Sequence, residues 1–139
     1  MFTDTISLIF NDTCFSRIIY LSLKINGPSS MTFALEYSGQ ICNVSGSKTE
    51  YFDLPYLDNI KSIYANGLID DYGVVIVNGQ EIWSKWDGGS GYPYPRSANL
   101  STSLFKKTNN SVYLYVKDDE GCSSGNRTHI FITLHFTYK

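Results

Sequence analysis

The fold is decided by the stretch DDYGVVIVNGQEIW, which runs from Asp70 to Trp83. Asn78-Gly79 separates two apolar segments here, and both central residues of a type I′ turn need positive φ, which Asn and Gly adopt at low cost. The stretch therefore predicts a β-hairpin in which Gly73–Val77 pairs with Gln80–Trp83. The aromatic, glycine-rich segment that follows is the candidate for what this hairpin supports.

Apolar and polar residues alternate along most of the remaining chain, which is the period of a strand with one buried face. Turn-forming residues interrupt this pattern frequently, and we expect Gly46–Lys48 to be one such polar turn. Many short strands without a clear helix predict an all-β fold, an antiparallel, jelly-roll-like β-sandwich formed as a single domain by residues 1–139. The further predicted strands are Phe2–Phe10, Arg17–Ile25, Met31–Tyr37, Ile41–Val44, Tyr51–Leu54, Ile60–Leu68, Val112–Val116 and Thr128–Tyr138.

The composition argues against several classes of protein. The chain has 139 residues, a net charge of -2, 15% aromatic residues and 17% charged residues. Nucleic-acid binding needs a basic face, which the 11 scattered Lys and Arg residues do not form. No stretch approaches the ~20 consecutive apolar residues of a membrane-spanning helix. The N-terminus lacks the basic and apolar regions of a signal peptide. The chain is therefore either a protein that stays inside the cell or a domain excised from a longer exported protein, and we expect the second.

Three cysteines, Cys14, Cys42 and Cys122, have no paired C-x-x-C spacing, which argues against a zinc site. A jelly roll places its first and last strands side by side, so the loop after the first strand lies near the loop before the last. On this topology Cys14 and Cys122 are the predicted disulfide. The alternative pairing is Cys14 with Cys42.

The segment Ser84–Ala98 is predicted to be a long loop, because its glycines and prolines do not suit regular structure. Rigid aromatic residues on a proline-stiffened loop provide a large contact area at low entropic cost. They also suit stacking on sugar rings, and the alternative is that they fold back to cap an open end of the sandwich. Arg96 is placed to make a charge-assisted contact with a carboxylate of a partner. The candidate binding residues are Trp86, Asp87, Tyr92, Tyr94 and Arg96.

Metal binding and catalysis find little support in the residues. Asp70 and Asp71 are candidate oxygen ligands for a hard cation, and the alternative is that they hydrogen-bond nearby backbone amides and shape the turn. His129 and His135 lie in the closing strand, and neither has a nucleophile or carboxylate at the spacing of a catalytic motif. We therefore expect no cofactor and no enzymatic activity.

Two patterns in the chain resemble known families. An acidic pair that opens an apolar strand ending in Asn-Gly resembles the galactose-binding-like jelly rolls. More narrowly, the middle of the chain resembles the TraN family, the outer-membrane mating-pair stabilisation proteins of F-like plasmids. TraN proteins are long and cysteine-rich, so the resemblance implies that this chain is an excised piece. The residues that carry it are Asp70-Asp71-Tyr72, Asn78-Gly79, Trp83 and Gly88-Gly89.

The TraN resemblance implies an exposed tip domain on the outer membrane of a donor cell, which recognises an outer-membrane protein, such as a porin, on the recipient during conjugation. A phage or other adhesin that uses the same sandwich is the alternative. From the residues, three functions stay open: a protein-recognition domain acting through Ser84–Ser97, a carbohydrate-binding module, and a structural sandwich within a larger surface assembly. In the carbohydrate hypothesis Trp86, Tyr92 and Tyr94 form the stacking platform.

Overall fold

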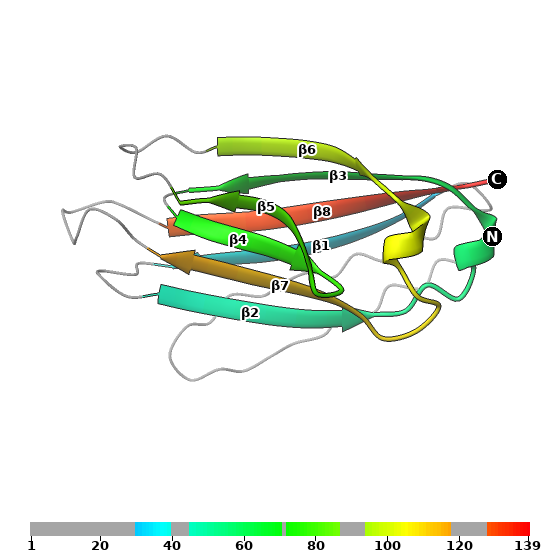
Figure 1. The fold of residues 1–139 in the computed structure, drawn as a ribbon, viewed down its shortest axis with the longest axis horizontal. Coiled ribbons are helices and arrows are strands. Elements are labelled where there is room, and N and C mark those ends of the chain that lie inside the picture. The colour runs from blue at the N-terminus through cyan, green and yellow to red at the C-terminus, as the bar shows by residue number, and fades with distance from the viewer. Residues whose placement is uncertain (1–29, 40–44, 71, 87–93, 118–127) are drawn as a thin grey trace.

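The alternating segments form two antiparallel sheets that pack face to face as a β-sandwich in the computed structural model (Figure 1). The structure describes residues 30–39, 45–70, 72–86, 94–117 and 128–139. Within these residues the first sheet has the order β1-β8-β3-β6 and the second has the order β2-β7-β4-β5. The strands are β1 (Ser30–Gly39), β2 (Ser45–Phe52), β3 (Ile60–Ile69), β4 (Tyr72–Val77), β5 (Gln80–Lys85), β6 (Tyr94–Leu100), β7 (Asn110–Lys117) and β8 (Thr128–Tyr138).

Among the described residues two short 3₁₀ helices interrupt the strands, η2 at Leu57–Asn59 and η3 at Thr102–Leu104. No helix in the described parts of the chain has the length and apolar character needed to cross a membrane. The predicted strands Phe2–Phe10, Arg17–Ile25 and Ile41–Val44 lie outside the described residues. The three cysteines lie outside them as well, so both predicted disulfide pairings stay predictions.

The strand pairs are nested around the Asn78-Gly79 turn. β4 pairs with β5, β3 with β6, β2 with β7 and β1 with β8, and every pair is antiparallel. The chain is therefore one long hairpin whose two arms wrap together, so that successive pairs alternate between the two sheets. This is the topology of a jelly roll. The predicted all-β, jelly-roll-like sandwich is confirmed.

The predicted hairpin is confirmed in its turn and in both of its strands. Asn78 and Gly79 have φ angles of 50° and 81°, as a type I′ turn requires. The Asn78 backbone N–H donates to the Ser111 carbonyl at 2.9 Å, and the Ser111 N–H donates back to Asn78 Oδ1 at 2.8 Å. The turn is thereby attached to β7, the neighbouring strand of β4.

A bulge in β5 decides which way Trp83 points. Val75 lies opposite Trp83, whereas the next residue of β4, Ile76, lies opposite Glu81. Ile82 is therefore an extra residue in β5, and such a residue shifts the side chains that follow it by one position. As a result Trp83 lies on the inward side of the sheet and is buried in the core.

A buried amide at the turn end of the sandwich joins three segments of the chain. The Asn110 side chain is inaccessible to solvent, and its Oδ1 accepts hydrogen bonds from the Lys106 N–H at 2.8 Å and from Asn78 Nδ2 at 2.9 Å. Its Nδ2 donates to the Lys106 carbonyl at 2.7 Å and to the Phe52 carbonyl at 3.3 Å. Every hydrogen-bonding position of this buried amide is used, which removes the usual cost of burying it.

The predicted polar turn at Gly46–Lys48 was wrong, because these residues lie inside β2. A Cβ atom at Gly46 would come within 2.3 Å of the Tyr37 hydroxyl oxygen, so the glycine makes room for a ring of the opposing sheet. Lys48 and Glu50 point toward that sheet and lie 3.7 Å apart. Inward-pointing charges are a common feature of edge strands, and β2 is at the edge of its sheet among the described strands.

The predicted loop Ser84–Ala98 was too long. β5 continues to Lys85 and β6 begins at Tyr94, so both ends of the predicted loop are strand. Pro95 lies within β6, which pairs only with β3 among the described strands. A proline is tolerated in a strand at the edge of a sheet, because its missing N–H has no partner to leave unpaired. Residues 87–93 lie outside the described residues.

Candidate functional site

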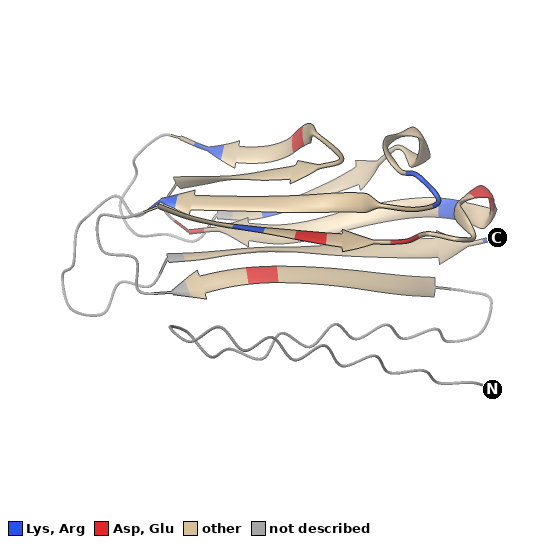
Figure 2. Cartoon of the chain, turned by 90° about the horizontal axis from the view of Figure 1, so that it is seen from below, with Lys and Arg blue, Asp and Glu red and all other residues tan. Residues whose placement is uncertain are grey.

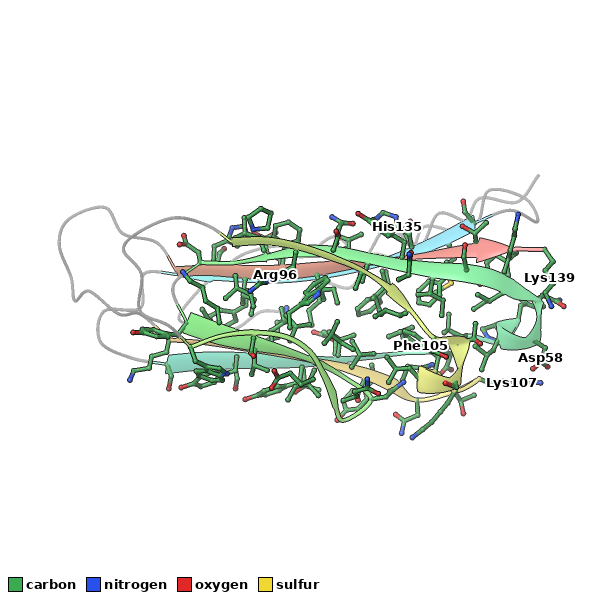
Figure 3. All side chains as sticks on the ribbon, turned by 45° about the horizontal axis from the view of Figure 1, so that its top comes forward. Asp58, Arg96, Phe105, Lys107, His135 and Lys139 are labelled. Atoms are coloured by element: carbon green, nitrogen blue, oxygen red, sulfur yellow. The ribbon has the colours of Figure 1, made fainter. Side chains whose placement is uncertain are left out.

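The structure places the predicted binding residues in different surroundings. Trp86 directly follows β5, and 56% of its surface is exposed. Arg96 is half-buried in β6, opposite Gly67 of β3. Because Gly67 and its alternate neighbours face the core, Arg96 lies on the side of β6 that faces the second sheet (Figure 3). Tyr94 belongs to the backbone of β6, while Asp87 and Tyr92 lie outside the described residues.

The acidic candidate site for a cation has one described member. Asp70 follows β3, and its backbone N–H donates to the His129 carbonyl at 2.8 Å, which continues the ladder between β3 and β8. Within the described ranges, no group of three or more His, Cys, Asp or Glu residues could hold a metal ion. Asp71 lies outside these ranges, so the cation site stays an untested prediction.

The outer side of the second sheet carries two of the four large hydrophobic residues that are exposed in the described ranges, Tyr51 and Trp86. Val75, Val77 and the alternate residues of β7 point inward and are fully buried, so the residues between them point outward. On β7 these outward residues include two tyrosines, and a third tyrosine lies at the end of β2 with 64% of its surface exposed. We call this surface the aromatic face, which consists of Tyr51, Tyr72, Val74, Ile76, Trp86, Tyr113 and Tyr115.

Val74 shows that the aromatic face is packed. It lies opposite Tyr115 and Ser84 and points away from the core, yet only 8% of its surface is exposed. The rings of Trp86 and Tyr115 lie 6.1 Å apart at an angle of 34°, within the range of favourable aromatic contacts. The outer side of this sheet therefore holds a small hydrophobic cluster, separate from the core between the sheets.

Charges are few on the aromatic face. The strands of the second sheet contain five charged residues, whose positions are coloured in Figure 2, and three of them, Lys48, Glu50 and Lys85, lie on the inward side. The register places Glu81 opposite Ile76 and Lys117 opposite Tyr72, at two edges of the aromatic face. The Ser84 hydroxyl donates to the Glu81 carboxylate at 2.5 Å. The remaining polar groups of this surface are hydroxyls, contributed by Ser45, Ser47, Thr49, Ser84 and Ser111.

The outer side of the first sheet has a different chemistry. Two adjacent rows cross all four strands, and we call these eight residues the polar face. His135 Nε2 lies 2.7 Å from Asn66 Oδ1, and the His135 ring is 6.0 Å from the Tyr64 ring. Tyr64 is 45% exposed. The first row is Thr32, His135, Tyr64 and Asn99, and the second is Ala34, Thr133, Asn66 and Ser97.

The second histidine belongs to the border of the polar face. His129 Nε2 lies 3.0 Å from Glu36 Oε1, which makes the two an ion pair when the imidazole is protonated. The His129 ring also lies 5.4 Å from the Phe131 ring. Both histidines are thus half-buried strand residues with local partners, as their place in the alternation of β8 predicts.

The sequence interpretation missed the outward tyrosines. Tyr113 and Tyr115 alternate with three buried apolar residues in β7, so the predicted strand Val112–Val116 already contained the signal. Tyr51 could not be joined to them in the same way, because its neighbour is decided by the pairing of β2 with β7. The candidate binding residues predicted in the segment after the hairpin therefore include only one described member of the aromatic face, Trp86.

Comparisons with known proteins give only a distant likeness. No family model and no curated protein matches the chain. The infectious bursal disease virus VP2 subviral particle is 10% identical, with a TM-score of 0.40, and the match covers 98% of this chain and 38% of the viral chain. The T=1 particles derived from infectious bursal virus are 13% identical, with a TM-score of 0.36 and coverages of 98% and 36%. The chain spans little more than a third of these viral proteins, and its fold assignment rests on its own strand order.

Proposed function

We propose that this chain is a recognition domain that binds a protein at a cell surface through the aromatic face. One observation carries the proposal: Trp86 and Tyr51, with exposed fractions of 56% and 64%, lie on the same sheet surface as Tyr113 and Tyr115. Aromatic residues are enriched and charged residues depleted at the centres of protein interfaces. Tyrosine surrounded by serine is also the composition of antibody contact surfaces.

The packing of this surface supports the same proposal. Trp86 is held against Tyr115, so part of its side-chain entropy is already lost before a partner binds. Aromatic anchors of this kind dominate the energy of many interfaces, and a single truncation then costs 2 kcal/mol or more, as an order of magnitude. Glu81 and Lys117 at the edges of the face are placed to contribute to orientation more than to affinity.

The TraN resemblance supplies the identity of the proposed partner. In that setting the domain belongs to a longer protein at the outer membrane of a donor cell, and the aromatic face contacts an outer-membrane protein of the recipient. A porin is the proposed class of partner.

Biolayer interferometry with purified porins in detergent tests the proposal. The 139-residue chain is immobilised, and binding is compared between the wild type and the Trp86→Ala, Tyr115→Ala double variant. We expect the double variant to weaken binding at least about 30-fold, the effect of a central aromatic anchor. Mating efficiency of a plasmid that encodes the same substitutions in the full-length protein gives the cellular counterpart.

Tyr64→Ala is the matched control, because it removes an exposed tyrosine from the opposite side of the sandwich. It should leave porin binding unchanged. Equal loss in both variants, or a double variant that binds as well as the wild type, would contradict the proposal. If the double variant unfolds, its residues stabilise the sandwich instead, and circular dichroism of each variant separates this outcome from lost binding.

A further inference from the structure

We infer that the polar face is a binding site for a neutral glycan. This inference concerns the sheet on the opposite side from the aromatic face and a different class of ligand, so it does not depend on the proposed protein partner. It rests on three properties of the same eight residues: their charge, their hydrogen-bonding groups and the exposed ring of Tyr64.

The absence of charged side chains from the polar face favours a neutral glycan over an acidic one. None of the eight residues is an aspartate, glutamate, lysine or arginine. The closest carboxylate in the register is Glu36, one row beyond Ala34, and its side chain is half exposed. Glu36 already faces His129 Nε2 at 3.0 Å. An acidic glycan would find no lysine or arginine in either row to pair with its own carboxylates, whereas a neutral glycan needs none.

The hydrogen-bonding groups are arranged to bind hydroxyls. When the His135 imidazole is neutral and donates from Nε2 to Asn66 Oδ1, its Nδ1 is an acceptor. The same bond occupies Asn66 Oδ1 and orients the amide nitrogen of Asn66, whose two N–H groups are donors. Thr133 lies between Ala34 and Asn66 in the second row and adds a hydroxyl that both donates and accepts. Sugar hydroxyls, which are donors and acceptors at once, complement this mixture.

Tyr64 provides the apolar element. One side of a pyranose ring is lined with C–H groups, and an aromatic ring can cover that side while the hydroxyls at its edge keep polar partners. Tyr64 is exposed, its position is supported by the His135 ring at 6.0 Å, and Asn99 lies opposite it on β6. A stacked sugar would therefore have an amide on one side and the His135–Asn66 pair on the other.

The width and the composition of the polar face suit an extended glycan chain better than a protein partner. Four strands about 4.8 Å apart give each row a width of about 14 Å. The polar face has one exposed large aromatic residue, whereas a protein interface concentrates several apolar anchors around its centre. A protein would also have to pair each desolvated amide and hydroxyl of these rows, or leave it unpaired at a cost. A glycan brings hydroxyl groups to each of them.

Affinity electrophoresis of the 139-residue chain through gels that contain a single polysaccharide tests the inference. The probes are a neutral glucan, a mannan and a galactan, with polygalacturonate as the acidic comparison, and a glycan array extends the set. We expect at least one neutral polysaccharide to retard the chain, and Tyr64→Ala to weaken this binding about 10-fold or more. Tyr64→Phe, which retains the ring, should retain most of the affinity.

Tyr51→Ala is the matched control, because Tyr51 is also an exposed strand tyrosine but belongs to the aromatic face. It should leave glycan binding unchanged. Asn66→Ala should weaken binding without loss of the fold, as circular dichroism would verify. Retardation by the acidic polysaccharide alone, no binding to any neutral glycan, or equal losses in Tyr64→Ala and Tyr51→Ala would overturn the inference.

Discussion

The two outer faces of the sandwich arise from the same alternation of residues but have opposite chemistry. On the second sheet the outward residues include four tyrosines, Trp86, Val74 and Ile76 among serines and a threonine, and Val74 is almost as inaccessible as a core residue. On the first sheet the eight positions of the polar face hold threonine, asparagine, serine, alanine, histidine and a single exposed tyrosine, Tyr64. Most inward residues must be apolar for the core to form, whereas nothing in the fold requires the outer sides of the two sheets to differ. The difference therefore indicates two separate contact surfaces.

The largest expected effect comes from the buried amide that supports the ends of both sheets. Asn110→Ala would leave polar groups of Phe52, Lys106 and Asn78 buried without their partner. At about 1–3 kcal/mol for a buried unsatisfied group, the free energy of unfolding should fall by roughly 3 kcal/mol or more. Guanidinium unfolding measures this loss of stability. Both sheets, and with them the aromatic and polar faces, should unfold in a single transition.

Asn109→Gly is the control for this substitution. Asn109 has a φ of 56°, which glycine adopts freely, and its hydrogen bond to Asp53 Oδ1 comes from the backbone N–H. The change should remain within about 0.5 kcal/mol. A loss below about 1 kcal/mol for Asn110→Ala would mean that water replaces the amide, and that the turn end is not the shared support of the two faces.

The close approach of β3 to β8 in its own sheet and to Trp83 of the opposing sheet depends on Gly67. A Cβ atom there would lie 2.3 Å from the Phe131 carbonyl oxygen and 2.7 Å from a ring carbon of Trp83. Gly67→Ala must displace the backbone of β8 and should lower the free energy of unfolding by about 1–3 kcal/mol. In Gly46→Ala the opposing atoms are the end of the Tyr37 side chain, which can rotate away. Thermal unfolding of both variants should show the smaller loss for Gly46→Ala, and equal losses would contradict this explanation.

The difference between the faces can be measured with double-mutant cycles. Trp86 and Tyr115 are in ring contact on the aromatic face, so their cycle should give a coupling energy of about 0.5–1.5 kcal/mol. Trp86 and Tyr64 lie on opposite sides of the sandwich, and their effects should add to within about 0.5 kcal/mol. Urea unfolding of the single and double variants provides both values. Zero coupling for Trp86 and Tyr115 would mean that the aromatic face is not packed before a partner binds.

The smallest effect concerns alkaline pH. Burial, followed by the charge of Tyr56, raises the pKa of Tyr138 from its ordinary value of 10.0. Because the folded protein favours the neutral phenol, this contribution to stability is complete below the unfolded pKa and is lost as the pH rises through the raised folded pKa. Tyr138→Phe should therefore lose less stability than the wild type above about pH 10. Chemical unfolding at several alkaline pH values measures this, with Tyr51→Phe as the control, and identical profiles would contradict it.

Much of the sandwich could be predicted because its signals are local. The bounds of β8 agree with the predicted strand Thr128–Tyr138, and the turn at Asn78-Gly79 has the backbone angles that its residues prefer. The errors occurred where a residue serves a distant part of the chain. Gly46 was interpreted as a turn residue but makes room for Tyr37, and the loop prediction through Ala98 overlooked that a proline is tolerated in an edge strand.

In strands without a bulge, such as β7 and β8, the sequence by itself determined which side chains point to the core, because successive residues of a strand alternate by backbone geometry alone. It also determined the centre of the jelly roll, since the Asn78-Gly79 turn needs only two neighbouring residues. The tertiary structure decided which outward residues share a surface. Tyr51 joins Tyr113 through the register of β2 and β7, and Tyr64 joins His135 through that of β3 and β8. Such pairings bring together residues about 60 to 70 positions apart, which no local pattern encodes.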